Sequence, residues 1–185
     1  MKGVSTAILA CGLMGAPAFA QQHQHDHDEV RQPQAGYESH GSHHHGQATL
    51  TFVLEGNEAE LAFDSPAANL TGFEHKPKDA AQQQKLQQVL DGFRLGHWFS
   101  FDAAAGCVVN SSEISSELER EAEHGHADLN ASYSLLCQDP EQLKQLSIQL
   151  AELGPGVEKV SVQWIVNGVQ GAAEWTPALG PVSLQ

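Results

Sequence analysis

Residues 46–63 read GQATLTFVLEGNEAELAF, and this stretch decides the fold. Apolar and polar residues alternate on both sides of Gly56-Asn57, as expected of two strands joined by a two-residue turn. Such a turn predicts three facing pairs: Leu54 with Ala59, Phe52 with Leu61, and Leu50 with Phe63. Every member of these pairs is apolar, so we expect an antiparallel hairpin with one buried face.

A second hairpin is expected within EKVSVQWIVNGVQGAAEW, residues 158–175, because Asn167-Gly168 is a strong signal for a type I′ turn. The turn places Trp164 opposite Gly171, and the small residue leaves room for the indole, so Trp164 is expected in the core. A further strand is predicted before Cys137, where apolar residues from Leu129 onwards alternate with polar ones. Shorter strands are predicted at HWFSF (97–101) and GCVVN (106–110).

Two amphipathic helices are predicted. In AAQQQKLQQVLDGF, residues 80–93, the apolar residues fall on one helical face. DPEQLKQLSIQLAELG, residues 139–154, has Asp139 at the N-cap, Pro140 in the first turn, Gly154 past the end and a leucine stripe. A linker is expected over 65–79, and an exposed helix or loop over 111–128. The fold class is therefore α+β: a mostly antiparallel β-sheet with two amphipathic helices on one face, preceded by a disordered His-rich leader.

The first 20 residues, MKGVSTAILACGLMGAPAFA, have the features of a secretory signal peptide. Lys2 precedes a short apolar stretch, and Ala18 and Ala20 supply the small residues of a cleavage site. We therefore expect cleavage after Ala20 and export. Lipid attachment at Cys11 is the alternative, since LACG is similar to a lipid-attachment motif.

The sequence beyond the predicted cleavage point divides into two parts. Residues 21–46 have almost nothing to bury, which predicts a disordered leader, and residues 47–185 are expected to form a single metal-binding domain. Cys107 and Cys137 predict one disulfide, because exported thiols oxidise readily; a thiolate metal site is the alternative. No later segment is apolar enough to predict a membrane span in the mature chain.

Charge and histidine content together point to cations. The formal charge is −14 and the chain contains 11 histidines. A duplex-binding protein needs the opposite sign, so nucleic acid is not an expected partner. The sequence contains no H-E-x-x-H, no G-x-S-x-G and no phosphate-binding Gly-Lys loop, so we expect a protein that is not an enzyme.

The histidines are clustered, and acidic residues accompany them. The groups are His23, His25 and His27; His40 and His43 to His45; His75 beside Glu74; and His124 with His126, followed by Asp128. Zn²⁺ favours three or four ligands from His, Cys and carboxylate, whereas imidazole also suits copper and nickel. For the N-terminal groups the alternatives are a solvated polar tail or, for SHHHG (42–46), an expression tag. His97 is a lone case expected to favour the C-terminus of a helix.

The first hairpin predicts which histidines meet. The start of one strand lies beside the end of the other, so His45 and the Glu74-His75 pair can share one rim of the sheet. If the strand from Asp128 starts at the same rim, then His45, His75, His126 and a carboxylate form a four-ligand zinc site. His43 and His124 are further candidate ligands. The mobile His23, His25 and His27 are expected to capture ions and pass them on.

A family resemblance agrees with these features. With GQATLTFVLEG, SPAANLTGFEH and HADLNASYSLLC in this order, the chain resembles the ZrgA family of periplasmic zinc-binding proteins of Gram-negative bacteria over about residues 45 to 175. The resemblance implies a periplasmic protein that binds Zn²⁺ and assists its uptake beside an ABC-type transporter. Family members carry a His-rich leader and a His- and acid-rich loop, which here look like residues 23–45 and 117–126.

We therefore expect a zinc-binding protein of the periplasm that captures or buffers Zn²⁺ for uptake. The alternatives are copper or nickel sequestration by the same histidines, a zinc hydrolase with an open coordination position, and a structural exported domain.

Overall fold

The predicted first hairpin lies at the centre of the larger of two sheets. The computed structural model describes residues 44–119 and 127–185, with β1 at Gln47–Glu55 and β2 at Glu58–Pro66. Their register is the predicted one: Leu54 opposite Ala59, Phe52 opposite Leu61, and Leu50 opposite Phe63. All six side chains are buried. The alternation of apolar and polar residues therefore predicted both the pairing and the buried face.

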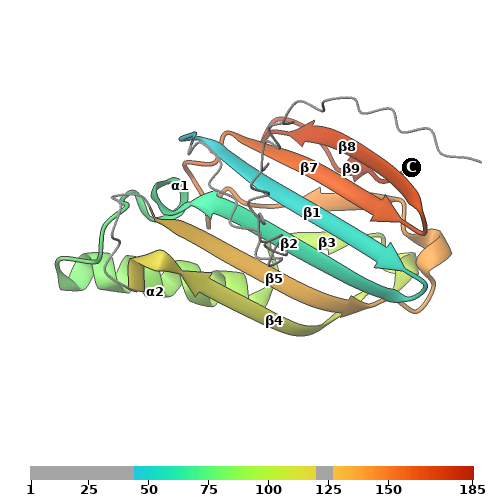
Figure 1. The fold of residues 1–185 in the computed structure, drawn as a ribbon, viewed down its shortest axis with the longest axis horizontal. Helices are drawn as coiled ribbons and strands as arrows, with labels where there is room; N and C mark the ends of the chain where they lie inside the picture. The colour runs from blue at the N-terminus through green and yellow to red at the C-terminus, as the bar shows by residue number, and fades with distance from the viewer. Residues whose placement is uncertain (1–43, 120–126) are drawn as a thin grey trace, which may run out of the picture. The chain divides into compact units, whose positions relative to one another are not determined.

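Six strands form this sheet in the order β4-β5-β2-β1-β7-β8 (Figure 1). The added strands are β4 (Val108–Ser116), β5 (Asp128–Leu136), β7 (Lys159–Val166) and β8 (Val169–Trp175). Neighbours are antiparallel except β1 and β7, which run parallel. The second hairpin is also confirmed, because Trp164 pairs with Gly171 and both Asn167 and Gly168 have the positive φ of a type I′ turn.

The remaining elements form a second layer. A three-stranded sheet has the order β3-β6-β9, with β3 at Phe99–Phe101, β6 at Gln145–Ile148 and β9 at Val182–Ser183. The helices are α1 (Ala67–Thr71) and α2 (Ala80–Leu95), and single 3₁₀ turns span Ala103–Ala105, Glu117–Glu119 and Pro140–Gln142. The predicted class, mostly β with two helices, is confirmed. No helix in the described part of the chain has the length and apolar character needed to cross a bilayer.

The helix predicted over residues 80–93 is present as α2. Asp79 caps its N-terminus by accepting a 2.9 Å hydrogen bond from the backbone N–H of Gln82. Gly96 ends the helix with a φ of 67°. The face that the sequence predicts as apolar is buried: Leu86, Val89, Leu90 and Phe93. Figure 1 shows α2 and β3 behind the six-stranded sheet, so one face of that sheet is covered by the second layer.

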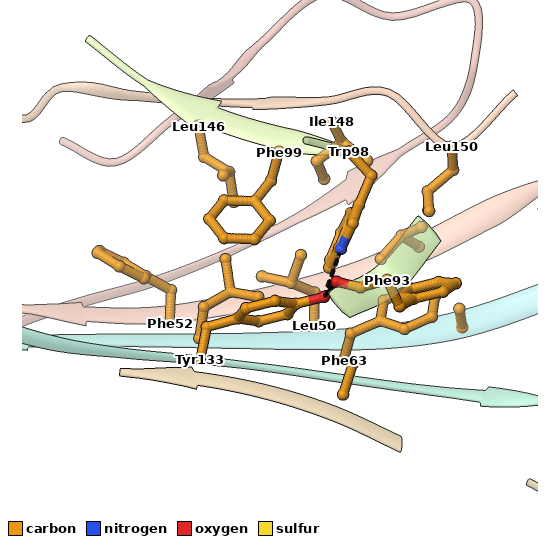
Figure 2. Packing of buried hydrophobic residues seen from close by; sticks show 14 of the residues in the cluster. Leu50, Phe52, Phe63, Phe93, Trp98, Phe99, Tyr133, Leu146, Ile148 and Leu150 are labelled. Carbon is orange, nitrogen blue, oxygen red and sulfur yellow. Dashed lines mark hydrogen bonds between the residues drawn. The ribbon is translucent and has the colours of Figure 1, made fainter. Parts of the chain in front are cut away.

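Aromatic side chains fill the space between the layers (Figure 2). The rings of Phe63, from the large sheet, and Phe93, from α2, have centroids 5.3 Å apart, and the Trp98 ring lies 5.0 Å from Phe63. The indole N–H of Trp98 donates to the hydroxyl of Tyr133 at 2.8 Å, and that hydroxyl donates to the carbonyl of Phe93. The polar atoms of these rings are therefore satisfied inside an apolar core.

The helix predicted over 139–154 is wrong. Asp139 begins only one 3₁₀ turn, after which the chain becomes β6 and pairs with β3. Asp102 Oδ2 accepts the backbone N–H groups of Lys144 and Gln145, each at 2.8 Å. In a helix these groups would bond to carbonyls four residues earlier, so the carboxylate takes over their role and the backbone stays extended.

Two further expectations need correction. Ser111–Ser116 is not a helix or loop but the second half of β4, whose first half and β3 match the predicted short strands. This edge strand exposes most of its side chains, so it carries little of the apolar alternation by which strands are recognised. The predicted linker over 65–79 contains α1.

The predicted disulfide is also present. Cys107 and Cys137 are bonded, which ties the start of β4 to the residue that follows β5. The predicted signal peptide and the leader up to residue 43 lie outside the described residues.

Candidate metal-binding rim

One end of the large sheet collects the start of β1, the end of β2 and the start of β5. Thr49 of β1 pairs with Asp64 of β2, and Pro66 at the end of β2 pairs with Asp128 at the start of β5. The residues just before β1, just after β2 and at the start of β5 therefore lie at the same end, as the site hypothesis requires. We call this end the rim and define it as His45, Gly46, Glu74, His75 and Asp128.

His45 and Glu74 face each other at the rim. His45 Nε2 lies 3.9 Å from Glu74 Oε1, and the two side chains are 68% and 16% exposed. Zn–N and Zn–O bonds of about 2.0–2.1 Å at a tetrahedral ion place neighbouring ligand atoms roughly 3.3 Å apart. The two groups therefore need to approach by only about half an ångström to share a zinc ion.

Hydrogen bonds at the end of α1 determine where Glu74 lies. Gly72 ends the helix with a φ of 87°. The Thr71 hydroxyl lies 2.9 Å from the carbonyl of Ala67 and 2.8 Å from that of Phe73, and it accepts the backbone N–H of Phe73 at 3.2 Å. The chain is thus held on both sides of the turn that leads into Glu74.

His75 is oriented by its two neighbours in the chain. Its ring stacks on Phe73, with centroids 5.5 Å apart and planes at 27°. Its Nδ1 lies 3.0 Å from the carbonyl oxygen of Lys76. Because a carbonyl only accepts, this contact places the proton of the neutral ring on Nδ1 and leaves the Nε2 lone pair for a metal.

Asp128 is half-buried at the start of β5. Its backbone N–H donates to Glu117 Oε2 at 3.2 Å, and the preceding carbonyl, that of Ala127, accepts the N–H of Ala67 at 2.7 Å. The latter bond connects the start of β5 directly to α1. Asp128 Oδ1 and Glu74 Oε1 are both shielded from solvent. Carboxylate oxygens shielded in this way attract a nearby cation more strongly than oxygens exposed to water.

The predicted ligands are only partly described. Within residues 44–119 and 127–185, no three His, Cys, Asp or Glu side chains are gathered closely enough to hold a metal. The other predicted ligands, His23, His25, His27, His43, His124 and His126, lie outside the described residues. His97 is exposed directly after the end of α2, as expected of a histidine at a helix C-terminus.

Sequence reasoning missed Asn69, the buried residue that connects the rim. Asn69 as a whole is 4% exposed, and its Oδ1 accepts the N–H of Gly46 at 2.8 Å. Its Nδ2 donates to the carbonyl of Gln47 at 2.9 Å and lies 3.2 Å from the hydroxyl of Ser65. The only hint in the sequence is an asparagine among small and apolar residues in AANLT, which is unusual for a solvated linker.

The outer face of the large sheet carries hollows that contain none of the rim residues. One of them, of about 490 Å³, lies over β1, β7 and β8, where Val53 and Ile165 are exposed. Two others, of about 380 and 180 Å³, lie mainly over β2, β4 and β5. No histidine lines any of the three, so the imidazole and carboxylate groups at the rim remain the candidate site.

The fold and the rim define a β-rich protein with imidazole and carboxylate groups at one end of its central sheet. A family model described as ZrgA family zinc uptake protein matches residues 42–184, a range that covers the rim and both sheets. The chain therefore belongs to the ZrgA family of zinc uptake proteins, which confirms the resemblance inferred from the sequence. No curated protein matches the chain at a significant level.

Proposed function

We propose that this protein captures or buffers Zn²⁺ in the periplasm and assists its delivery to an ABC-type transporter, without catalysing a reaction. The observation that carries the proposal is the approach of His45 Nε2 to Glu74 Oε1, 3.9 Å, in a chain that belongs to a zinc uptake family. In this proposal Zn²⁺ is cargo, so its site must release the ion as well as bind it.

The proposed ligands combine the two sides of the rim. His45 supplies one imidazole, His75 supplies a second through Nε2, and Glu74 or Asp128 supplies the carboxylate. His126 completes the four-ligand set. Two further candidate ligands lie close in sequence to these histidines: His43 beside His45, and His124 beside His126. Four ligands of this kind suit a tetrahedral zinc ion.

Zinc affinity should depend on pH, because only neutral imidazole binds a metal. Protons compete with zinc for the imidazole nitrogens as the pH falls. Calorimetric titration with Zn²⁺ at pH 7 and pH 5 should therefore give a clearly weaker tight site at pH 5. Equal affinity at the two pH values would rule out histidine ligation.

Substitution at the rim tests the ligands directly. His45→Ala and Glu74→Ala should each lower the affinity of the tightest site by about tenfold or more, measured by competition with a chelator. His97→Ala is the matched control, because His97 is an exposed histidine outside the rim. A His97→Ala loss as large as that of His45→Ala would contradict the proposed site.

Sequestration of copper or nickel is the alternative that uses the same residues. Affinity cannot separate it from zinc uptake, because copper binds most nitrogen and oxygen sites more tightly than zinc does. The response of the cell does separate them: zinc starvation should induce the protein if it serves uptake, and excess copper should induce it if it sequesters. Growth under a zinc chelator that depends on this protein and on the transporter would support the delivery step.

A further inference from the structure

Asn69 holds the backbone that directly follows His45. Its Oδ1 accepts the N–H of Gly46 and its Nδ2 donates to the carbonyl of Gln47, at 2.8 and 2.9 Å. The carbonyl of Gly46 in turn accepts the N–H groups of Glu158 and Lys159, at 2.8 and 2.9 Å. The Gly46 peptide groups are thus fixed from both sides, and the Asn69 side chain supplies the contacts on one of these sides. Because Gly46 N is bonded to the carbonyl carbon of His45, the place of His45 depends on this arrangement.

The same residue is connected to the opposite side of the rim. Asn69 lies in α1, which ends at Gly72 and is followed by the turn that Thr71 holds in front of Glu74. The backbone carbonyl of Asn69 also accepts the N–H of Gly156 at 2.9 Å, in the loop before β7. The short helix α1 therefore fixes the position of Glu74 through the backbone turn that follows it, and the position of His45 through the side chain of Asn69.

We propose that Asn69 is a positioning residue for zinc binding: it does not touch the ion, but it holds His45 opposite Glu74, within about half an ångström of the separation that a shared ion needs. This inference rests on the proposed function, since it assumes that His45 is a ligand. Groups that hold a metal ligand in place commonly change metal affinity by about 10- to 100-fold when they are removed. Asn69 differs from such groups only in acting on the backbone beside the ligand.

The test is a double-mutant cycle on zinc affinity, measured in the full chain at pH 7 by competition between Zn²⁺ and a chelator. Asn69→Ala should weaken the tightest site by about tenfold or more. In a His45→Ala background the same substitution should change affinity by less than about twofold, because the ligand that Asn69 positions is already gone. A purely structural role would give the same loss in both backgrounds.

Two control variants make the result decisive. Asp102→Asn weakens a side-chain to backbone contact in the other layer of the fold, so it should lower stability but leave zinc affinity unchanged.

Gly46→Ala changes the residue whose N–H bonds to Asn69 and whose carbonyl bonds to Glu158 and Lys159. Gly46 has a φ of 81°, and a Cβ there would approach the Glu158 carboxylate to 3.0 Å. Gly46→Ala should therefore weaken zinc binding too, and it carries the test where Asn69→Ala does not fold.

The outcomes separate this inference from the proposed function. Loss of affinity in Asn69→Ala that disappears in the His45→Ala background supports the positioning role. Unchanged affinity in Asn69→Ala, or in Gly46→Ala, while His45→Ala weakens binding, overturns the positioning role and leaves the proposed site standing. Full affinity in His45→Ala removes the proposed site, and the positioning role with it.

Discussion

The indole N–H of Trp98 donates a 2.8 Å hydrogen bond to the hydroxyl of Tyr133, and both side chains are about 99% buried. The two residues come from opposite layers, so this bond fixes the register in which the layers meet. The Tyr133 hydroxyl in turn donates a hydrogen bond to the carbonyl of Phe93. Tyr133→Phe would leave the buried indole N–H of Trp98 without a partner and remove one hydrogen bond to the carbonyl of Phe93, which still accepts the N–H of Gly96. We expect it to lower the free energy of unfolding by about 1–3 kcal/mol, measured by urea denaturation.

The same burial raises the pKa of Tyr133 to about 12. The unfolded chain releases this proton near pH 10, whereas the folded protein keeps it until about pH 12. Protons bound to the folded state alone make stability fall as the pH rises between these values. The urea midpoint should therefore drop between pH 10 and pH 12, and Tyr133→Phe should reduce that drop. An identical drop in the variant would show that other groups cause it.

Asp102 should make stability sensitive to acid. Hydrogen bonds from the backbone N–H groups of Lys144 and then Gln145 hold its pKa below the usual value of 3.8. A lowered pKa in the folded state means that the stabilisation is present above pH 3.8 and is lost as the pH falls through the folded pKa. Urea midpoints at pH 6 and pH 3 should therefore differ less in Asp102→Asn than in the wild type. Equal differences would mean that other carboxylates dominate.

Gly171 is required by the ring of Trp164. A Cβ at Gly171 would lie 2.3 Å from Trp164 Cζ2, and the indole is 92% buried, so it has little space to move. Gly171→Ala should cost about 1–3 kcal/mol of stability, as overpacking of a core usually does. Gly180→Ala is the matched control, because a Cβ there meets nothing within 4 Å. The two variants should differ clearly in melting temperature, and equal melting temperatures would contradict the packing.

The N-terminal histidines should affect capacity more than affinity. Replacing His23, His25 and His27 together by alanine should reduce the number of zinc ions bound per chain while leaving the affinity of the tightest site within about twofold, because we propose that these histidines capture ions and that the rim forms the tightest site. Titration calorimetry gives both quantities. A large loss of the highest affinity with unchanged stoichiometry would contradict this division between capture and tight binding.

The parts of the fold that the sequence predicts are those with one dominant period. The β1–β2 hairpin was predictable because large apolar residues occupy every second position, Leu50, Phe52 and Leu54, although the apolar Val53 lies between two of them. Residues 143–153 were ambiguous, because two apolar patterns overlap there. Leu146, Ile148 and Leu150 have the period of two of a strand, whereas Leu143, Leu146, Leu150 and Leu153 have the spacing of a helical stripe. The choice depended on Asp102, some 40 residues earlier, whose bonds to this segment no local pattern reveals.

The candidate site was predictable to the extent that it follows from hairpin topology. A hairpin brings the residue before its first strand close to the residues after its second, which is how His45 and Glu74 were paired. Strand order was not predictable, so the position of Asp128 was open until the pairing of β2 with β5 was known. Asn69 was missed because its role consists of hydrogen bonds to residues more than 20 positions away.

The parallel pairing of β1 with β7 joins two strands about 110 residues apart in the chain. β1 is synthesised long before β7, so the middle of the large sheet cannot close until β7 is available. Until residue 159 has emerged, β1 presents an unprotected edge to which other chains can add. The architecture thus delays completion of the large sheet until β7 is available, and a chain truncated before β7 should aggregate instead of folding.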